Sequence, residues 1–151
     1  MAIAGLGGLG SNVAYALARI GVGHLHLIDF DVVDITNLNR QQYFMEHLGM
    51  YKTDALKSLL LKINPYLDIQ TDCVKVTEEN IVDLLRDDSI ICEAFDRPEA
   101  KAMLVNGVLE HFPEIDKAQC VSYPPGQHPA AVNLVVFSRI EDNRYFLSSP
   151  W

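Results

Sequence analysis

A glycine-rich segment near the amino terminus has the residue types and spacing of a phosphate-binding loop. The segment Gly5-Leu6-Gly7-Gly8-Leu9-Gly10 fits the pattern G-x-G-x-x-G and lies between a short apolar run and a stretch with helical spacing. Glycine permits a tight turn and a close approach of the backbone to a phosphate, and the N-terminus of the following helix offers N–H donors and a partial positive charge. The glycines that predict nucleotide binding are Gly5, Gly7, Gly8 and Gly10.

Two carboxylates follow the next expected strand. His24 to Ile28 alternates polar and apolar residues, and Asp29 and Asp31 come directly after it. A carboxylate at the end of the second strand of a βαβ unit is placed to accept hydrogen bonds from ribose hydroxyls. These features predict a nucleotide site without distinguishing NAD, FAD and ATP.

Polar and cationic residues continue further along the chain. Asn37-Leu38-Asn39-Arg40-Gln41 is followed by Gly49-Met50-Tyr51-Lys52, and Asp96 follows a later apolar run. A carboxylate oxygen is a ligand that magnesium prefers. Two other interpretations stay open: Arg40 and Lys52 could be solvated surface charges, and Asp96 could serve only to stabilise a helix N-terminus.

Taken in this order, these features resemble the ThiF/MoeB/HesA family, bacterial relatives of ubiquitin-activating enzymes. The resemblance extends to about Phe112 and rests on the glycine loop, the N-L-x-R-Q run, the lysine in a G-x-x-K setting and the later aspartate. It implies an ATP-dependent adenylyltransferase. The expected substrate is the C-terminal carboxylate of a ThiS-like, ubiquitin-like sulfur-carrier protein of thiamine biosynthesis, and pyrophosphate is released. Molybdopterin-type sulfur transfer, or a carboxylate on a tRNA base, would use the same nucleotide site.

The resemblance implies an ATP-binding role for several residues. Asp29 would accept hydrogen bonds from the ribose, and Lys52 would contact the phosphate chain. Asn37 and Arg40 would lie at or near the phosphates, with Gln41 beside them.

The resemblance also implies a magnesium ion as a second cofactor. Asp96 would bind the metal, and Asp31 is a secondary candidate for its neighbourhood. Arg40, Lys52 and Asp96 are therefore the expected catalytic residues.

Two departures from the family pattern keep other hypotheses open. The helical segment that usually precedes the first strand and supports the family's dimer is expected to be missing, although a homodimer is still expected. The segment from Gln119 to His128 also differs from the small-residue path that the carrier tail follows in relatives. The alternatives are a catalytically impaired nucleotide-binding or dimerising subunit, and an NAD-dependent oxidoreductase on the same kind of fold.

Composition and charge place the chain among soluble globular proteins. Its 151 residues predict a single domain, 1–151, with 49% hydrophobic and 21% charged residues. A net charge of −8 argues against nucleic acid or an anionic membrane as a partner. No apolar run reaches the length of a membrane span, and no signal peptide is visible, so a cytoplasmic location is expected.

Alternating strands and helices must position these residues. Strands are expected at 2–4, 24–28, 68–76 and 89–94, and helices at 9–20, 56–63, 77–85 and 98–109. This alternation predicts an α/β fold, doubly wound and Rossmann-like, with a mostly parallel sheet and helices on both faces. An antiparallel C-terminal hairpin of 132–140 with 144–147 is also possible.

The histidines and cysteines do not suggest a metal centre. His24 and His26 share one strand face without a third ligand at useful spacing, which favours a strand edge that faces solvent. Cys73, Cys92 and Cys120 have no paired spacing, and nothing in their setting marks a reactive thiol.

Overall fold

The computed structural model describes residues 1–122 and 133–139. The strands are β1 (Ala2–Ala4), β2 (His24–Ile28), β3 (Asp68–Asp72), β4 (Ile90–Glu93), β5 (Ile115–Ser122) and β6 (Asn133–Arg139). The helices are α1 (Gly8–Ile20), α2 (Lys52–Ile63), α3 (Ile81–Leu85) and α4 (Pro98–His111), with short 3-10 helices η1 (Ile35–Asn37) and η2 (Met45–His47). In this part of the chain, no helix combines the length and apolar character that a membrane span needs.

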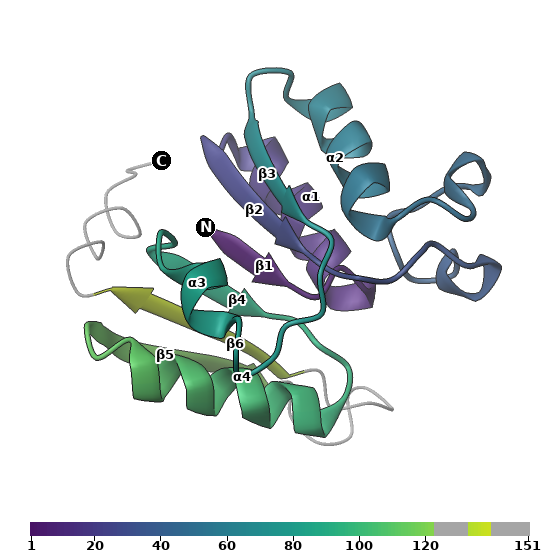
Figure 1. Ribbon diagram of the computed structural model, residues 1–151. Coiled ribbons are helices and arrows are strands. Elements are labelled where there is room, and N and C mark those ends of the chain that lie inside the picture. The colour runs from purple at the N-terminus through teal and green to yellow at the C-terminus, as the bar shows by residue number, and fades with distance from the viewer. Residues whose placement is uncertain (123–132, 140–151) are drawn as a thin grey trace.

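The strands form one six-stranded sheet in the order β3-β2-β1-β4-β6-β5 (Figure 1). The first four strands are parallel, whereas β6 is antiparallel to both β4 and β5. The predicted doubly wound, mostly parallel α/β fold is confirmed. The antiparallel strand expected at 132–140 forms as β6, but it pairs with β4 and β5, and its expected partner 144–147 lies outside the described residues.

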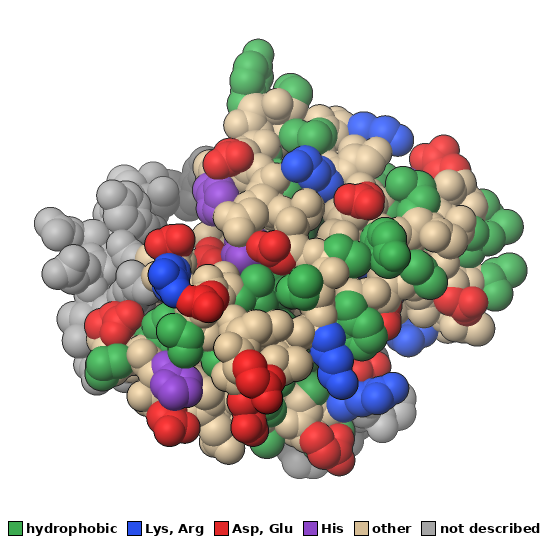
Figure 2. Space-filling model, viewed as in Figure 1, with side chains coloured by type: hydrophobic (Ala, Val, Ile, Leu, Met, Phe, Trp, Pro, Cys, Tyr) green, Lys and Arg blue, Asp and Glu red, His purple; other side chains and the backbone are tan. Residues whose placement is uncertain are grey.

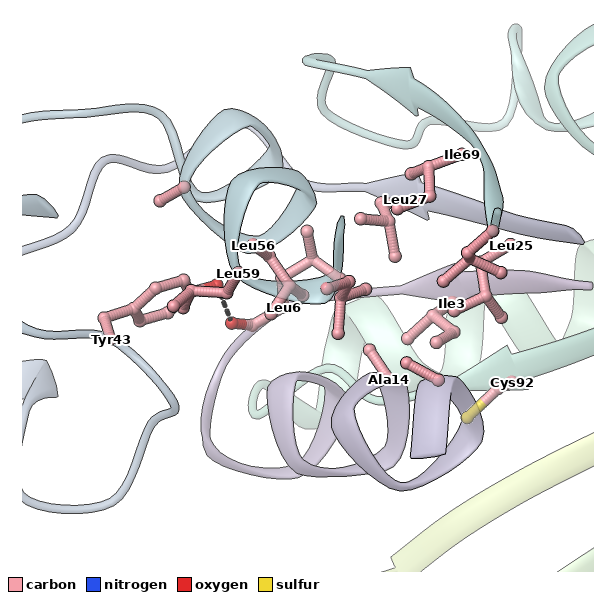
Figure 3. Packing of buried hydrophobic residues seen from close by; sticks show 14 of the residues in the cluster. Ile3, Leu6, Ala14, Leu25, Leu27, Tyr43, Leu56, Leu59, Ile69 and Cys92 are labelled. Carbon is pink, nitrogen blue, oxygen red and sulfur yellow. Dashed lines mark hydrogen bonds between the residues drawn. The ribbon is translucent and has the colours of Figure 1, made fainter. Parts of the chain in front are cut away.

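Helices cover both faces of the sheet. Figure 1 shows α1 and α2 on one side and α3 and α4 on the other. Because side chains alternate along a strand, Ile3 packs with the α1 and α2 cluster, while its neighbours Ala2 and Ala4 pack with the opposite one. Figure 3 shows the first cluster, to which Leu56 of α2, Ala14 of α1 and Ile3 of β1 all belong. This packing fixes α1, and hence the loop that precedes it, against the sheet.

Several element boundaries differ from the sequence expectation. Helix α2 begins at Lys52, four residues before the periodic leucines, and β3 ends at Asp72. Thr77 does not start α3, because the Asn80 side-chain oxygen accepts the Thr77 N–H at 2.8 Å and the helix begins after Asn80. Leu109, the last residue of the expected helix 98–109, is exposed on α4.

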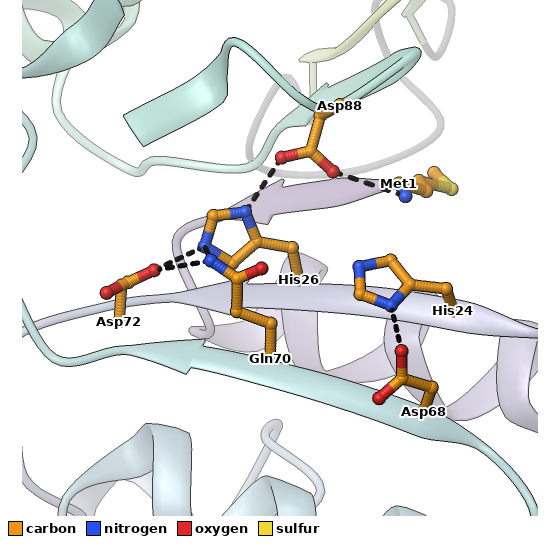
Figure 4. Close-up of polar contacts among 7 residues, drawn as sticks. All are labelled: Met1, His24, His26, Asp68, Gln70, Asp72 and Asp88. Carbon is orange, nitrogen blue, oxygen red and sulfur yellow. Dashed lines mark hydrogen bonds and ion pairs between the residues drawn. The ribbon is translucent and has the colours of Figure 1, made fainter. Parts of the chain in front are cut away.

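The expectation that His26 faces solvent at a strand edge is wrong. Strand β2 lies inside the sheet, and the His26 ring is buried between two aspartates (Figure 4). Its Nδ1 lies 2.7 Å from Asp88 and its Nε2 lies 2.7 Å from Asp72, while the Met1 amino group lies 3.3 Å from the other Asp88 oxygen. His24, farther along the same face, pairs with Asp68 at 2.8 Å. The network joins β2 to β3 and to the loop before β4.

This network makes stability depend on pH. Burial alone would lower the pKa of His26, but the hydrogen bonds and charges of Asp88 and then Asp72 outweigh it and raise the pKa above 6.5. The folded state therefore binds the proton more tightly than the unfolded state, and the resulting stability is complete below pH 6.5 and lost as the pH rises through the folded pKa. We expect the free energy of unfolding of the native chain, relative to His26→Gln, to fall by up to about 1.4 kcal/mol per pH unit in that window. Urea unfolding between pH 6 and pH 9 measures it, and a difference that is flat or rises with pH would contradict the assignment.

Candidate functional site

The candidate site lies where the carboxyl ends of three strands meet. Gly5 follows β1, Asp29 follows β2, and the loop 94–97 follows β4. The sheet order places β1 between β2 and β4, so the chain reverses its direction of winding at this point. In open α/β sheets such a reversal is where ligands bind, outside the carboxyl ends of the strands.

The first and last glycines of the loop are required by packing. Gly5 has φ +94°, and a Cβ there would lie 2.9 Å from the Phe95 ring and 3.0 Å from the Ala94 backbone. A Cβ on Gly10 would lie 1.8 Å from the Gly5 carbonyl oxygen. Helix α1 therefore packs directly on the turn that precedes it.

The middle glycines leave the helix end open. A Cβ on Gly7 would have its nearest contact at 3.9 Å, and one on Gly8 at 3.4 Å, in both cases with flexible side chains. Gly7 and Gly8 are half-buried, and on this side the start of the 13-residue helix α1 is bordered by flexible side chains rather than by backbone. The N–H groups of a first helical turn have no partner within the helix. The backbone of Gly7 and Gly8 therefore forms a cradle that suits an anion.

Asp29 connects the glycine loop to β2. Its carboxylate is almost fully buried and accepts the Leu6 N–H at 2.6 Å and the Asp31 N–H at 2.8 Å. A carboxylate offers about four acceptor positions, so further hydrogen bonds from a ligand hydroxyl are chemically available. The contact with ribose itself stays a prediction.

A second connection joins α1 to residues 40–42. The Asn12 amide group donates to the Gly8 carbonyl at 2.5 Å and to the Arg40 carbonyl at 3.1 Å, and its oxygen accepts from Gln42 at 2.5 Å. Sequence reasoning missed Asn12 and Gln42. The available signal was the spacing of Gly8 and Asn12, because Asn in a helix can bond to the carbonyl four residues earlier.

Tyr43 holds the loop from the other side and was also missed. Its hydroxyl donates to the Leu6 carbonyl at 2.8 Å, which is the dashed line in Figure 3. Burial and then the charge of Asp29 raise the pKa of Tyr43, so the phenol stays protonated as a donor. The glycine loop is thus fixed before any ligand arrives.

Arg40 lies over the cradle as an exposed side chain. Its Cγ would be 3.4 Å from a Cβ on Gly8, and its Nη1 donates to the Thr36 carbonyl and to the Asn39 side chain at 3.0 Å each. The structure therefore places a cation beside the first turn of α1. An exposed position is compatible with both interpretations of Arg40, as a phosphate contact and as a solvated surface charge.

Gln41 lies beside Arg40 and is buried. Its Nε2 would be 3.9 Å from a Cβ on Gly7, and its Oε1 is buried without a hydrogen-bond partner within the described part of the chain. A buried polar atom without a partner is costly and calls for an explanation such as a missing ligand or water. Its position next to the open glycine fits the predicted ligand contact.

Asn37 shapes the loop in this structure. Its side-chain oxygen accepts the Asp34 N–H at 3.0 Å, and its carbonyl accepts the Gln41 N–H at 3.0 Å. These bonds close η1 and direct residues 40–41 toward the glycine loop. The phosphate contact of Asn37 stays a prediction.

Lys52 is not a solvated surface charge. It is 6% exposed at the start of α2, and its Nζ lies 2.9 Å from Asp31 Oδ2. The two residues are also joined through their backbones, because the Lys52 N–H donates to the Asp31 carbonyl at 2.9 Å. Asp31, two residues after Asp29, therefore orients the ammonium group at this edge of the sheet.

Asp96 is exposed on the loop between β4 and α4. The Ala94 N–H donates to the Ala4 carbonyl at 2.8 Å, and Phe95 meets Gly5, so this loop starts against the glycine turn. Across residues 1–122 and 133–139, no group of three or more His, Cys, Asp or Glu side chains is arranged to hold a metal ion. A magnesium ion at Asp96 would therefore need further oxygen ligands from a bound phosphate or from water, which is common for this ion.

Cys92 does not supply a nucleophile. Burial and then the neighbouring charge of Glu93 raise the pKa of Cys92 to about 12, so the thiol stays protonated at neutral pH. Cys73 is exposed, and Cys120 lies on β5. The Cys92 thiol therefore has no part in the candidate site.

Two hollows in the surface lie away from this site. One of about 260 Å³ lies between α3 and α4, and another of about 390 Å³ lies between β3 and α3. Neither is lined by a residue of the glycine loop. The site is recognised from its residues and backbone rather than from its depth.

One family model and several known sequences match this chain. The model of the ThiF family matches residues 1–121. The molybdopterin-synthase adenylyltransferase of Haemophilus influenzae is 38% identical over 105 residues, which are 69% of this chain and 43% of that protein. The adenylyltransferase and sulfurtransferase UBA4 of Scheffersomyces stipitis is 34% identical over 107 residues, 70% of this chain and 24% of that protein.

Comparison with solved structures gives a similar result. The E. coli tRNA N6-threonylcarbamoyladenosine dehydratase TcdA, solved in complex with ATP, superposes with a TM-score of 0.69 and 32% identity. The match covers 72% of this chain and 46% of that one. The chain therefore spans less than half the length of each of these three proteins.

Proposed function

Because this chain belongs to the ThiF family, we propose that it catalyses the ATP-dependent adenylylation of a C-terminal carboxylate on a ThiS-like, ubiquitin-like sulfur-carrier protein. The observation that carries the proposal is the cradle of Gly7 and Gly8, with the Arg40 side chain beside it and the buried Gln41 Oε1, which has no hydrogen-bond partner among the described residues. A cradle without side chains next to a cation is the geometry that a polyphosphate requires.

ATP fits the residues that surround this cradle. The phosphates would lie against the first turn of α1, and Asp29 would accept hydrogen bonds from the ribose. The related dehydratase was solved with ATP, which supports this nucleotide over NAD.

The reaction needs no protein nucleophile or general base. A carboxylate oxygen of the carrier attacks the α-phosphorus of ATP, the bond from that phosphorus to the bridging oxygen breaks, and pyrophosphate leaves with the electron pair. A C-terminal carboxyl group is already ionised at neutral pH. The chain's own task is to hold both reactants in line and to offset the repulsion between their negative charges.

Three side chains would supply the local charges. Arg40 would contact the phosphates from above the cradle, and Lys52, oriented by Asp31, would meet the phosphate chain from the start of α2. A bound magnesium ion would offset negative charge on the phosphate oxygens. Asp96 would hold that ion at the end of β4.

A second substrate class deserves a test because of the likeness to the tRNA dehydratase. The same nucleotide site could activate a carboxylate that is attached to a tRNA base. The net charge of −8 opposes this candidate, since nucleic-acid binding relies on a basic surface. The sulfur carrier therefore stays the main proposal.

We also propose that the chain acts as a homodimer in the cytoplasm. The segment between β2 and α2 exposes several large apolar side chains, which gather at one edge of the molecule in Figure 2. They are Phe30, Val32, Ile35, Phe44, Met45, Leu48, Met50 and Tyr51. A concentrated apolar patch on an acidic protein fits a second copy of the chain better than an anionic partner.

Exchange of labelled pyrophosphate into ATP tests the proposed reaction. We expect exchange that depends on magnesium and on a ThiS-like carrier with an intact C-terminus. ATP binding without exchange would favour the impaired subunit, preferential NAD binding would favour the oxidoreductase, and exchange that requires tRNA would favour the second substrate class.

Replacing Lys52 by Ala tests the cation at the start of α2. We expect the exchange rate to fall about 100-fold, the effect of removing one preorganised charge-stabilising group. Lys62→Ala is the matched control, because Lys62 lies on the same helix as an exposed side chain with a weak ion pair to Glu46. Equal exchange rates in the two variants would remove Lys52 from the mechanism.

A further inference from the structure

A buried ion pair lies at the base of the loop that carries Asp96. Glu93, the last residue of β4, is 0% exposed, and its carboxylate receives the Lys101 ammonium group at 2.9 and 3.2 Å. Lys101 lies one turn inside α4, on the far side of the loop. The pair therefore bridges the two ends of the segment 94–97.

The same carboxylate holds the backbone of that segment. Glu93 Oε1 accepts the Phe95 N–H at 2.6 Å, a short bond of the kind that a charged acceptor makes. Phe95 in turn lies against Gly5, the first residue of the glycine loop. Glu93 and Gly5 thus fix the residue immediately before Asp96.

Burial of the Glu93 carboxylate costs the folded state free energy. Glu93 points to the same face of the sheet as Ile91, toward α4 and the apolar cluster there, and a buried ion pair stabilises a protein less than well-packed apolar residues would. A carboxylate in that position nevertheless does what no apolar side chain could, because it binds a backbone N–H and an ammonium group together. The Glu93 carboxylate thereby holds the segment 94–97 in one defined conformation.

We propose that Glu93 and Lys101 are a positioning pair, which fixes the Phe95 backbone and so places the Asp96 carboxylate beside the glycine cradle. This inference rests on the proposed role of Asp96 in holding magnesium next to ATP. Neither residue touches substrate; both act through the loop.

The first test measures the loop without nucleotide. In Glu93→Ala, hydrogen exchange of the Phe95 amide, followed by NMR, should be at least about tenfold faster than in the native chain, because its buried acceptor is gone. Glu93→Gln keeps an acceptor oxygen and is expected to lie between the two. Glu99→Gln, an exposed acid on the first turn of α4, is the matched control and should leave the Phe95 amide unchanged.

The second test measures metal binding through Asp96. Residues that orient a metal ligand typically change metal affinity about 10- to 100-fold when they are replaced. In Glu93→Gln we expect the magnesium concentration for half-maximal pyrophosphate exchange to rise about tenfold, with the KM for ATP at saturating magnesium within about twofold of the native value. Lys101→Arg keeps the ion pair and should retain the native magnesium dependence, whereas Lys101→Met should not.

The outcomes separate this inference from the proposed function. A faster Phe95 amide with unchanged magnesium dependence would overturn the inference, because the pair would then be structural alone. If the native chain catalyses no exchange, the proposed function fails, and binding of Mn²⁺ with ATP, followed by electron paramagnetic resonance, replaces the kinetic measurement. Equal Mn²⁺ affinity in the native chain and Glu93→Gln would then overturn the inference, and weaker binding in the variant would support it.

Discussion

Replacing Asp96 by Ala is expected to lower carrier-dependent pyrophosphate exchange about 1,000-fold, the upper range for removing one preorganised electrostatic group. The reason is that Asp96 belongs to no group of three or more metal-binding side chains in the described part of the chain, so we expect its carboxylate to supply most of the protein's share of metal binding. Asp96 is exposed, and its removal should change the free energy of unfolding by less than about 0.5 kcal/mol. Exchange kinetics and urea unfolding of the same preparation check both statements.

Two further variants define the role of Asp96. Asp96→Asn keeps the size of the side chain but removes its charge, and it should lose nearly as much exchange activity as Asp96→Ala. Asp87→Ala removes an exposed acid at the amino end of β4, away from the glycine loop, and should keep native activity. If Asp96→Ala retained native exchange, the carboxylate would have no part in the reaction.

Replacing Gly10 by Ala is expected to cost at least about 3 kcal/mol in the free energy of unfolding, at the upper end of the range for overpacking. The added Cβ would lie 1.8 Å from the Gly5 carbonyl oxygen, which is backbone and cannot rotate away. Helix α1 would have to move from the turn, and Asn12 and Ser11 on its first turns would move with it. Chemical denaturation measures the loss, and ATP binding should be lost together with the native helix position.

Gly7→Ala is the matched variant because it should separate binding from folding. Gly7 has a negative φ of −75°, outside the left-handed region, and its Cβ would meet nothing closer than 3.9 Å. Stability should change by less than about 1 kcal/mol, while ATP affinity falls because the methyl group occupies the phosphate side of the loop. A Gly10→Ala chain as stable as the native one would contradict the packing of α1, and full ATP affinity in Gly7→Ala would contradict the phosphate position.

The fold class could be predicted because its signals are local. The apolar run before Gly5, the helical spacing after it and the alternation at 24–28 each depend on neighbouring residues. The place of β6 between β4 and β5 could not be predicted, because it pairs residues more than 40 positions apart in the case of β4. His26 was misjudged for a similar reason, since its aspartate partners come from β3 and from the loop before β4.

Residues of the candidate site could be predicted where their type and spacing are typical of one kind of binding site. Glycines at fixed spacing, an acid after a strand and cations in an acidic chain all carry such information. Asn12, Tyr43 and Glu93 carry none by themselves, because their contacts depend on how the loops 40–43 and 94–97 fold onto the glycine turn. A polar side chain that positions other residues becomes recognisable only in three dimensions.

Titration of the chain with magnesium and ATP, followed residue by residue through backbone amide NMR shifts, tests the central claim most directly. Saturable shifts are expected at Gly7 to Gly10, at Asp29, and at Arg40 and Gln41, with Asp96 responding when magnesium is present. Shifts confined to the α3 and α4 face, or no saturable binding of ATP, would contradict it.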